Sequence, residues 1–145
     1  MTATVSLMAL SRAYRSAADS ALSSYGLSQA TAWPVIVTGR LGDGIRQGAL
    51  AEALGVEGPS LVRVLDQLVT SGLIERREAP HDRRARTIHL TADGHALREQ
   101  VETVLVNLRR QMFKDVSPDD LDAYIRVMDT IKTALHKENT TATLQ

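Results

Sequence analysis

Three polar side chains are spaced so that they share one face of a predicted helix. Ser60, Arg63 and Gln67 follow one another at intervals of three and four residues, which is the repeat of an α-helix. A helix fits the major groove of double-stranded DNA, where arginine can bond guanine through two hydrogen bonds, glutamine can bond adenine, and serine suits a base edge or a phosphate. The stripe predicts direct recognition of DNA bases, with Arg63 as the main contact. The alternative interpretation is a solvated helix surface.

A second group of side chains, rich in arginine, follows closely along the chain. Between residues 76 and 86 five arginines stand against two carboxylates, a net charge of +3. Arginine suits a narrow minor groove, where the negative potential is strong but the pattern of bases is degenerate. We expect this stretch to add affinity more than specificity, through Asp82, Arg83, Arg84 and Arg86. In this hypothesis Asp82 pairs with Arg84 and fixes the tip of a loop.

The composition is that of one soluble globular domain. The chain has 145 residues, of which 43% are hydrophobic, and its 17 basic and 17 acidic residues give a net charge of zero. Cysteine is absent, which excludes disulfides, thiolate nucleophiles and thiol-based redox sensing. The longest apolar run, Ala32 to Val37, is too short to span a bilayer, and the N-terminal residues carry no export pattern. We therefore expect a cytoplasmic protein with no membrane partner.

Hydrophobic periodicity predicts the elements that position these side chains. Apolar residues at steps of three and four indicate a first helix over residues 7–25 and a second over residues 28–41. Pro34 lies within the second helix and should kink it or delay its start. A short third helix should end at Gly55.

The polar stripe belongs to a fourth helix, predicted over residues 58–71. Two short helices joined by a tight turn describe a helix-turn-helix. Predicted strands at residues 73–77 and 86–90, with a polar loop over 78–85 between them, form a hairpin, or wing. The predicted fold is mainly α, an α+β winged helix-turn-helix whose DNA-binding lobe covers residues 27–91.

Helices with long apolar stripes flank this lobe, over residues 1–26 before it and 92–137 after it. The stripes are longer than a core of this size needs, and two-fold homodimers are the commonest oligomers. We therefore expect the N- and C-terminal helices to form a homodimer, with a monomeric helical bundle as the alternative. Residues 138–145 lack periodicity and are expected to form a disordered tail.

Five runs of residues occur in an order typical of one family: Gly55-Val56-Glu57-Gly58-Pro59-Ser60-Leu61-Val62-Arg63, Leu65-Asp66-Gln67-Leu68, Gly72-Leu73-Ile74, Asp82-Arg83-Arg84-Ala85 and Leu90-Thr91-Ala92-Asp93-Gly94. They resemble the MarR family of winged-helix regulators, closest to its SlyA-like branch. The resemblance implies a dimeric transcriptional repressor or activator with a recognition helix from Pro59 to Ser71. It also implies that Arg63 contacts bases, and that Arg84 enters the minor groove as part of an Asp-x-Arg pair with Asp82.

The resemblance further implies an effector, a small aromatic or phenolic anion held between the dimer helices and the DNA-binding lobe. The candidates for binding it are three aromatic residues for the ring and two arginines for a carboxylate, each with a core or surface role as its alternative: Tyr14, Tyr25, Trp33, Arg15 and Arg40. Pro34 departs from the family's usual pattern, which puts the shape of the pocket in question.

Other classes of function lack their motifs. The sequence has no glycine-rich phosphate loop, no Gly-x-Ser-x-Gly elbow and no His-Glu-x-x-His, so we expect neither enzymatic activity nor a cofactor. The four histidines have no metal-ligand spacing, so no metal site is expected. The remaining alternative is a winged-helix adaptor that binds protein without DNA readout, which an apolar or acidic face on the fourth helix would indicate.

Overall fold

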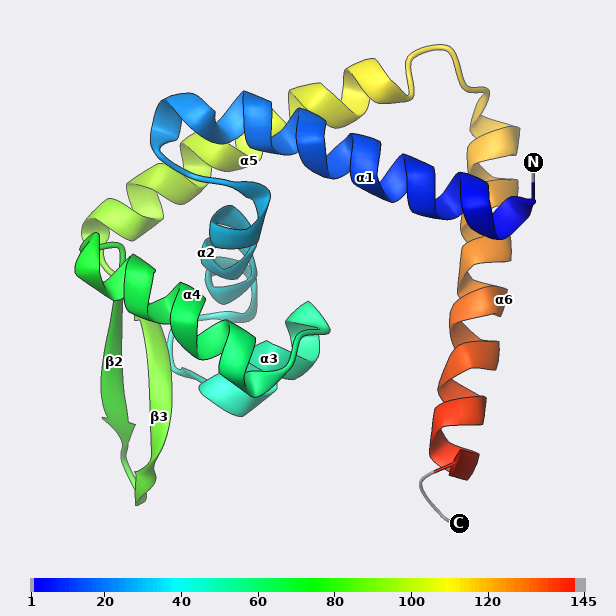
Figure 1. Cartoon of the computed structure of the whole chain (residues 1–145). Helices are drawn as coiled ribbons and strands as arrows, with labels where there is room; N and C mark the ends of the chain where they lie inside the picture. Colours follow the sequence, from blue (N-terminus) through cyan, green and yellow to red (C-terminus); the bar gives the residue numbers. More distant parts are fainter. Residues whose placement is uncertain (1, 143–145) are drawn as a thin grey trace. The chain divides into compact units, whose positions relative to one another are not determined.

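A computed structural model describes residues 2–142, which fall into two compact units divided between Arg109 and Arg110. The first unit holds α1, a short 3-10 helix η1, α2, β1, α3, α4, β2, β3 and most of α5 (Figure 1). The second unit holds the end of α5 and α6. Residues 2–142 contain six α-helices and a small sheet, and the first unit has the predicted winged helix-turn-helix.

The first helix, α1 (Ala3–Leu22), ends three residues earlier than predicted. The chain tightens into η1 (Ser23–Tyr25) and then turns at Gly26, whose φ of 68° lies in the left-handed region. Glycine adopts this conformation without a steric cost. The predicted stop at Gly26 is therefore correct, although the last turn before it is a 3-10 helix.

The second helix, α2 (Gln29–Leu41), begins with a capping box. The Ser28 hydroxyl accepts a hydrogen bond from the Thr31 N–H, and the Thr31 hydroxyl oxygen accepts one from the Ser28 N–H. These contacts satisfy two N–H groups that would otherwise lack partners at the helix start. Because the helix begins at Gln29, the buried Pro34 lies inside it and does not delay its start.

The helix-turn-helix consists of α3 (Gln47–Leu54) and α4 (Gly58–Thr70). Gly55 ends α3 in the left-handed region, at a φ of 64°, and Pro59 lies in the first turn of α4, where its missing N–H costs nothing. The turn between the two helices has the predicted length. It orients α4 so that one side of the helix packs on the lobe and the other is exposed.

The sheet has three antiparallel strands in the order β1-β3-β2. The wing strands β2 (Ile74–Ala79) and β3 (Asp82–Leu90) are longer than predicted, and the expected loop over residues 78–85 is reduced to two residues. The predicted loop was too long because Glu78 and Arg86 pair across the strands and continue the ladder. The third strand, β1 (Ile45–Arg46), was not predicted, and it pairs with Ile88 and Thr87 of β3.

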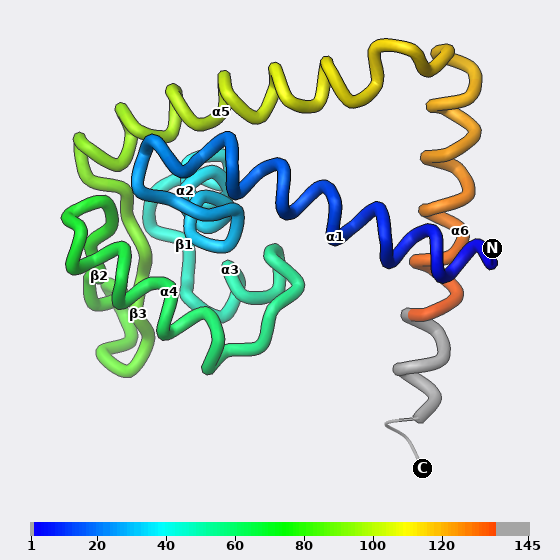
Figure 2. Tube along the Cα trace, turned by 45° about the horizontal axis from the view of Figure 1, so that its top comes forward, coloured from blue at the N-terminus to red at the C-terminus, as the bar shows by residue number. Residues whose placement is uncertain are grey.

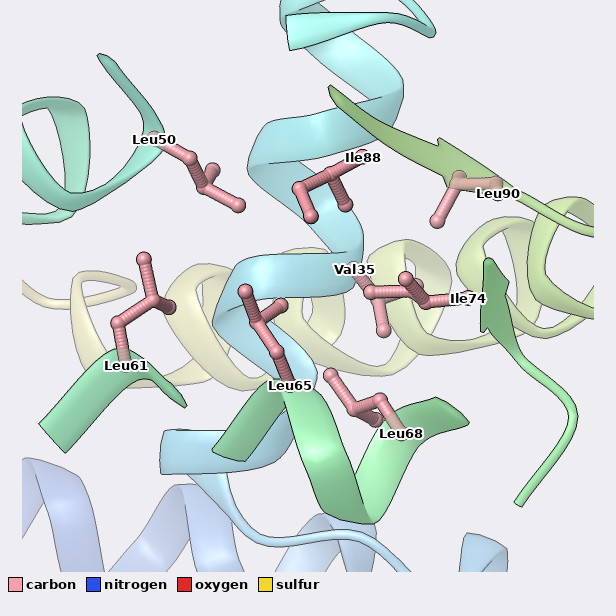
Figure 3. Packing of buried hydrophobic residues seen from close by; sticks show 8 residues of the cluster. All are labelled: Val35, Leu50, Leu61, Leu65, Leu68, Ile74, Ile88 and Leu90. Carbon is pink, nitrogen blue, oxygen red and sulfur yellow. The ribbon is translucent and has the colours of Figure 1, made fainter. Parts of the chain in front are cut away.

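Two hydrophobic clusters meet at α2. One joins α2 to α3, α4 and the sheet, and Figure 3 shows Leu61, Leu65 and Leu68 pointing from α4 into it. The other joins α2 to α1 and α5, through the following buried residues: Ala18, Leu22, Ala32, Ile36, Val101 and Leu105. Because α2 contributes to both clusters, it connects the recognition lobe to the flanking helices.

The chain passes from β3 directly into α5 (Ala92–Met112) (Figure 2). The Thr91 hydroxyl accepts a hydrogen bond from the Gly94 N–H at 3.0 Å and so caps the start of this helix. In the second unit α6 (Pro118–Ala142) is capped by Ser117, whose hydroxyl accepts from the Asp120 N–H at 3.1 Å. The residues expected to form a disordered tail from 138 onward are helical as far as Ala142, and residues 143–145 lie outside the described part. None of the helices in residues 2–142 is long and apolar enough to cross a membrane.

Candidate DNA-binding surface

The stripe of polar residues on α4 is exposed. Ser60, Arg63 and Gln67 all lie on the solvent side of the helix, whereas Leu61, Leu65 and Leu68 on the opposite side are at most 2% exposed. The packed leucines hold the helix against the lobe, and the short turn from α3 fixes its start. The arrangement presents three side chains with donors and acceptors on one rigid face.

The wing residues predicted to contact DNA lie on the strand β3 and not in a loop. Asp82, Arg83, Arg84 and Arg86 are all exposed on this strand, and the register shifts between the Glu78–Arg86 and Ala79–Asp82 pairs, as at a β-bulge. Asp82 Oδ1 accepts a hydrogen bond from the backbone N–H of Arg84 at 3.0 Å. The contact between Asp82 and Arg84 therefore runs through the backbone, which braces the turn and leaves the Arg84 guanidinium exposed.

Acidic partners compensate three of the five arginines between residues 76 and 86. Arg86 pairs with Glu78 across the strands at 3.2 Å, Arg77 pairs with Glu75 on its own strand, and Arg76 pairs with Asp66 of α4 at 2.6 Å. Arg83 and Arg84 are both exposed, and in the part of the chain that the structure describes no ion pair involves them.

The net charge of this stretch is consequently concentrated near the tip of the wing. The sequence interpretation missed these pairs, because Glu78 and Arg86 become neighbours only through the strand register. Only the Glu75–Arg77 pair could have been predicted from the sequence, because residues two apart share a face of a strand. Exposed ion pairs contribute little to stability, so Arg77 and Arg86 can exchange a carboxylate for a phosphate.

Asp43 joins three elements at the base of the wing and was also missed. Its carboxylate accepts a hydrogen bond from the Leu90 N–H at 2.9 Å and lies 3.0 Å from Nε2 of His95 in α5. Slight burial raises the pKa of Asp43, but the Leu90 N–H, His95 and His89 outweigh it, so the pKa of this carboxyl is lowered from 3.8. The favoured negative charge ties the loop before β1 to the start of α5.

A cavity of about 430 Å³ lies beside the recognition helix. It is lined by residues of α1, α2, the turn after α3, and α4, among them Arg15, Trp33, Pro34 and Ser60. A volume of this size is typical of sites for small organic ligands. Of the five predicted effector residues, the cavity brings together Arg15 and Trp33.

The other three predicted effector residues do not line this cavity. Tyr14 and Tyr25 are half-buried elsewhere, and Arg40 pairs with Glu102 of α5 at 3.0 Å. Arg40 lies in the last turn of α2, whereas the cavity lies beside the first turns of that helix. The length of the helix between them therefore separates Arg40 from Trp33. Pro34 forms part of the cavity lining, so the departure noted in the sequence affects its shape directly.

Comparisons with known proteins agree with this architecture. A model of the MarR family matches residues 25–85, from η1 to the wing. The crystal structure of transcriptional regulator PA3341 is 34% identical to this chain, covers 92% of this chain and 98% of its own, and superposes with a TM-score of 0.82. The chain belongs to the MarR family.

Two further MarR-fold structures are more distant in sequence. The S. aureus MepR–DNA complex has a TM-score of 0.86 at 20% identity, over 93% of this chain and 98% of that one. A mutant of MarR from E. coli, complexed with operator DNA, has a TM-score of 0.79 at 24% identity, over 86% and 89%. At such identities they show that the fold is shared over nearly the whole length.

Proposed function

We propose that this MarR-family chain is a sequence-specific DNA-binding repressor of the SlyA-like branch, which binds a pseudo-palindromic operator as a homodimer. The observation that carries the proposal is the exposed stripe of Ser60, Arg63 and Gln67 on a helix whose other side is fully packed. The two similar structures with bound DNA support the same role for this fold. In a dimer two such helices occupy successive major grooves, about one helical turn apart, with the wings on the flanking minor grooves.

Unburied apolar side chains support the homodimer. Along α1 four large apolar residues are exposed: Val5, Leu7, Met8 and Leu10. The second unit, considered by itself, exposes a similar series along α6: Tyr124, Ile125, Val127, Ile131 and Leu135. Clusters of exposed large apolar side chains mark interaction sites, and a second copy of the chain supplies the same clusters by symmetry.

The cavity supports a small aromatic anion as effector. The Trp33 ring offers a stacking surface and the Arg15 guanidinium a partner for a carboxylate. Ser60, Leu61 and Val64 of α4 also line the cavity, so a bound ligand can favour a displaced position of α4. Such a ligand weakens DNA binding, and bound DNA weakens ligand binding by the same factor. A coupling of roughly 1 to 3 kcal/mol corresponds to a 5- to 150-fold response.

The test begins with selection of bound fragments from random duplex DNA by the purified protein. We expect a pseudo-palindrome whose half-sites are about one helical turn apart. The absence of any complex with mixed duplexes at low salt would contradict DNA binding and favour a protein-binding adaptor.

Benzoate is then titrated into the operator complex, with benzyl alcohol as the uncharged control. We expect release by benzoate, and its loss in Arg15→Gln. Arg12→Gln, one turn away on α1 and outside the cavity lining, should respond like the wild type. Equal release from both variants would remove Arg15 from the effector site.

A further inference from the structure

Arg76 of β2 reaches across to the recognition helix. Its Nη1 lies 2.6 Å from Oδ1 of Asp66, and its Nη2 donates to the backbone carbonyl of Val62 at 3.4 Å. Val62 and Asp66 are four residues apart on α4, so one guanidinium spans a full turn of the helix. The planar fork of arginine is suited to such a double contact.

The two acceptors lie on the flank of α4, between its packed leucines and its polar stripe. Asp66 directly precedes Gln67 and follows Arg63 by three residues. Side-chain tips lie about 5 to 6 Å from a helix axis, so a rotation of about 20° would move them by roughly 2 Å. A displacement of this size breaks a hydrogen bond to a base. The rotation of α4 about its axis must therefore be fixed for base recognition, and the leucine contacts alone are non-directional.

The Arg76 side chain is only 26% exposed. Its Nε is buried, and the structure gives that atom no hydrogen-bond partner among the described residues. Leaving a buried N–H without a partner is costly, and the two Nη contacts and the packing of the side chain must offset this cost. Its charge is paired with Asp66 of α4 at the edge of the lobe, although the sequence counts it with the basic stretch of the wing.

We propose that Arg76 is a positioning residue for base recognition, which fixes the rotation of α4 through Asp66 and the Val62 carbonyl and so sets sequence discrimination without touching DNA. The proposal rests on the DNA-binding function proposed above. It assigns a role that differs from that of an arginine binding phosphate, since neutralising a phosphate affects all sequences and the salt dependence alike.

The experiment compares Arg76→Met with Arg77→Met, the neighbouring and more exposed arginine of the same strand. For each variant the dissociation constants for the selected operator and for an unrelated duplex of equal length are measured over a range of salt concentrations, together with urea unfolding. For Arg76→Met we expect the ratio of the two constants to fall roughly tenfold, comparable to one mismatched base pair, with unrelated-DNA affinity and salt slope unchanged. Arg77→Met should keep the wild-type ratio.

Each other outcome identifies a different role. Equal weakening on both duplexes with a salt slope reduced by about one would make Arg76 a phosphate contact and overturn the proposal. A lower unfolding midpoint with an unchanged ratio would make it a purely structural residue, and would overturn it as well. If the wild type bound no DNA, the proposed function itself would fail, whereas an unchanged ratio beside normal operator binding would remove only the role of Arg76.

A second set of variants keeps the test decisive if Arg76→Met does not fold. Asp66→Asn should lower the ratio in the same direction, and Arg76→Lys should give an intermediate ratio because a single ammonium replaces the two-pronged fork. In Asp66→Asn/Arg76→Lys the two effects should not add, since both weaken one interaction. If Asp66 merely repelled phosphate, Asp66→Asn would instead raise the affinity for every duplex, and this result would contradict the proposal.

Discussion

At the scale of single residues, the arginines of this lobe divide by what surrounds them. Arg63 stands on the exposed face of α4, Arg84 is exposed near the wing tip, and Arg76 is half-buried and paired with Asp66 of α4. All three side chains carry the same charge, so residue type does not distinguish their roles. These different environments are the basis on which we propose base contact for Arg63, minor-groove contact for Arg84 and helix positioning for Arg76.

The first prediction separates the first two of these roles. Arg63→Ala should cost about 1 to 3 kcal/mol on the operator and relax base choice, because a bidentate contact to one base is lost. Arg84→Ala should weaken operator and unrelated DNA alike and lower the salt slope by about one. Binding titrations on both duplexes at several salt concentrations distinguish the two patterns. Unchanged binding by both variants would contradict the assignment of the surface.

At the scale of elements, the start of α5 is held against the turn that follows α4. A Cβ added to Gly94 would lie 2.1 Å from the carbonyl oxygen of Leu73, a backbone atom that cannot move aside like a flexible side chain. The Thr91 N–H donates to that same carbonyl at 3.1 Å, and the Thr91 hydroxyl donates to the Gly72 carbonyl at 2.7 Å. The close approach explains why glycine stands at this position.

The second prediction therefore concerns Gly94→Ala. We expect a loss of about 1 to 3 kcal/mol of stability, the usual cost of forcing atoms into a packed site, measured as a lower urea midpoint. Gly48→Ala is the matched control, because Gly48 also lies in the first turn of a helix but has no neighbouring atom within 4 Å of its added Cβ. That control should be neutral or slightly stabilising. Equal midpoints for both variants would mean that α5 can shift freely.

The third prediction uses the contact of Asp43 with Leu90 and His95. Because the folded-state pKa of Asp43 is lowered from 3.8, its charge stabilises the fold above that value, and the contribution is lost as the pH falls through the lower, folded pKa. Asp43→Asn can keep the hydrogen bond from Leu90 but has no charge. The wild type should therefore be more stable than Asp43→Asn at neutral pH, and the difference should shrink below about pH 3.8. Urea unfolding at a series of pH values measures it, and a pH-independent difference would exclude the charge as its cause.

Elements with strong periodicity could be predicted from the sequence, and elements that depend on pairing could not. The caps at Ser28, Thr91 and Ser117 and the turn at Gly55 are local, because each uses atoms within a few residues. β1 has two residues and no period of its own, and it is a strand only because it pairs with β3. The same holds at the candidate site. The stripe on α4 follows from helical spacing alone, whereas the partners of Arg76 and Asp43 come from other elements.

At the scale of the whole molecule, the decisive property is what the single chain leaves uncovered. Leu10 is 47% exposed although the stripe on α1 that contains it continues into the buried Leu22. An apolar stripe that is buried at one end and exposed at the other is expected where a second surface completes the burial.

The last prediction is that Leu10→Glu weakens the homodimer. In a dimer that buries this stripe, an unpaired carboxylate would lose its solvation, and we expect the dimer dissociation constant to rise roughly tenfold or more. Ser11→Glu adds the same charge on the next residue, which is turned by about 100° around the helix, and should leave the dimer intact. Sedimentation over a range of concentrations measures both variants. Operator affinity should fall with dimerisation in Leu10→Glu, because a monomer binds only one half-site. Two results would contradict the prediction: a wild type that stays monomeric at micromolar concentration, or a Leu10→Glu variant that behaves like Ser11→Glu. Either would show that this part of α1 is an ordinary solvent-exposed face, and the proposed pairing of two recognition helices would lose its structural basis.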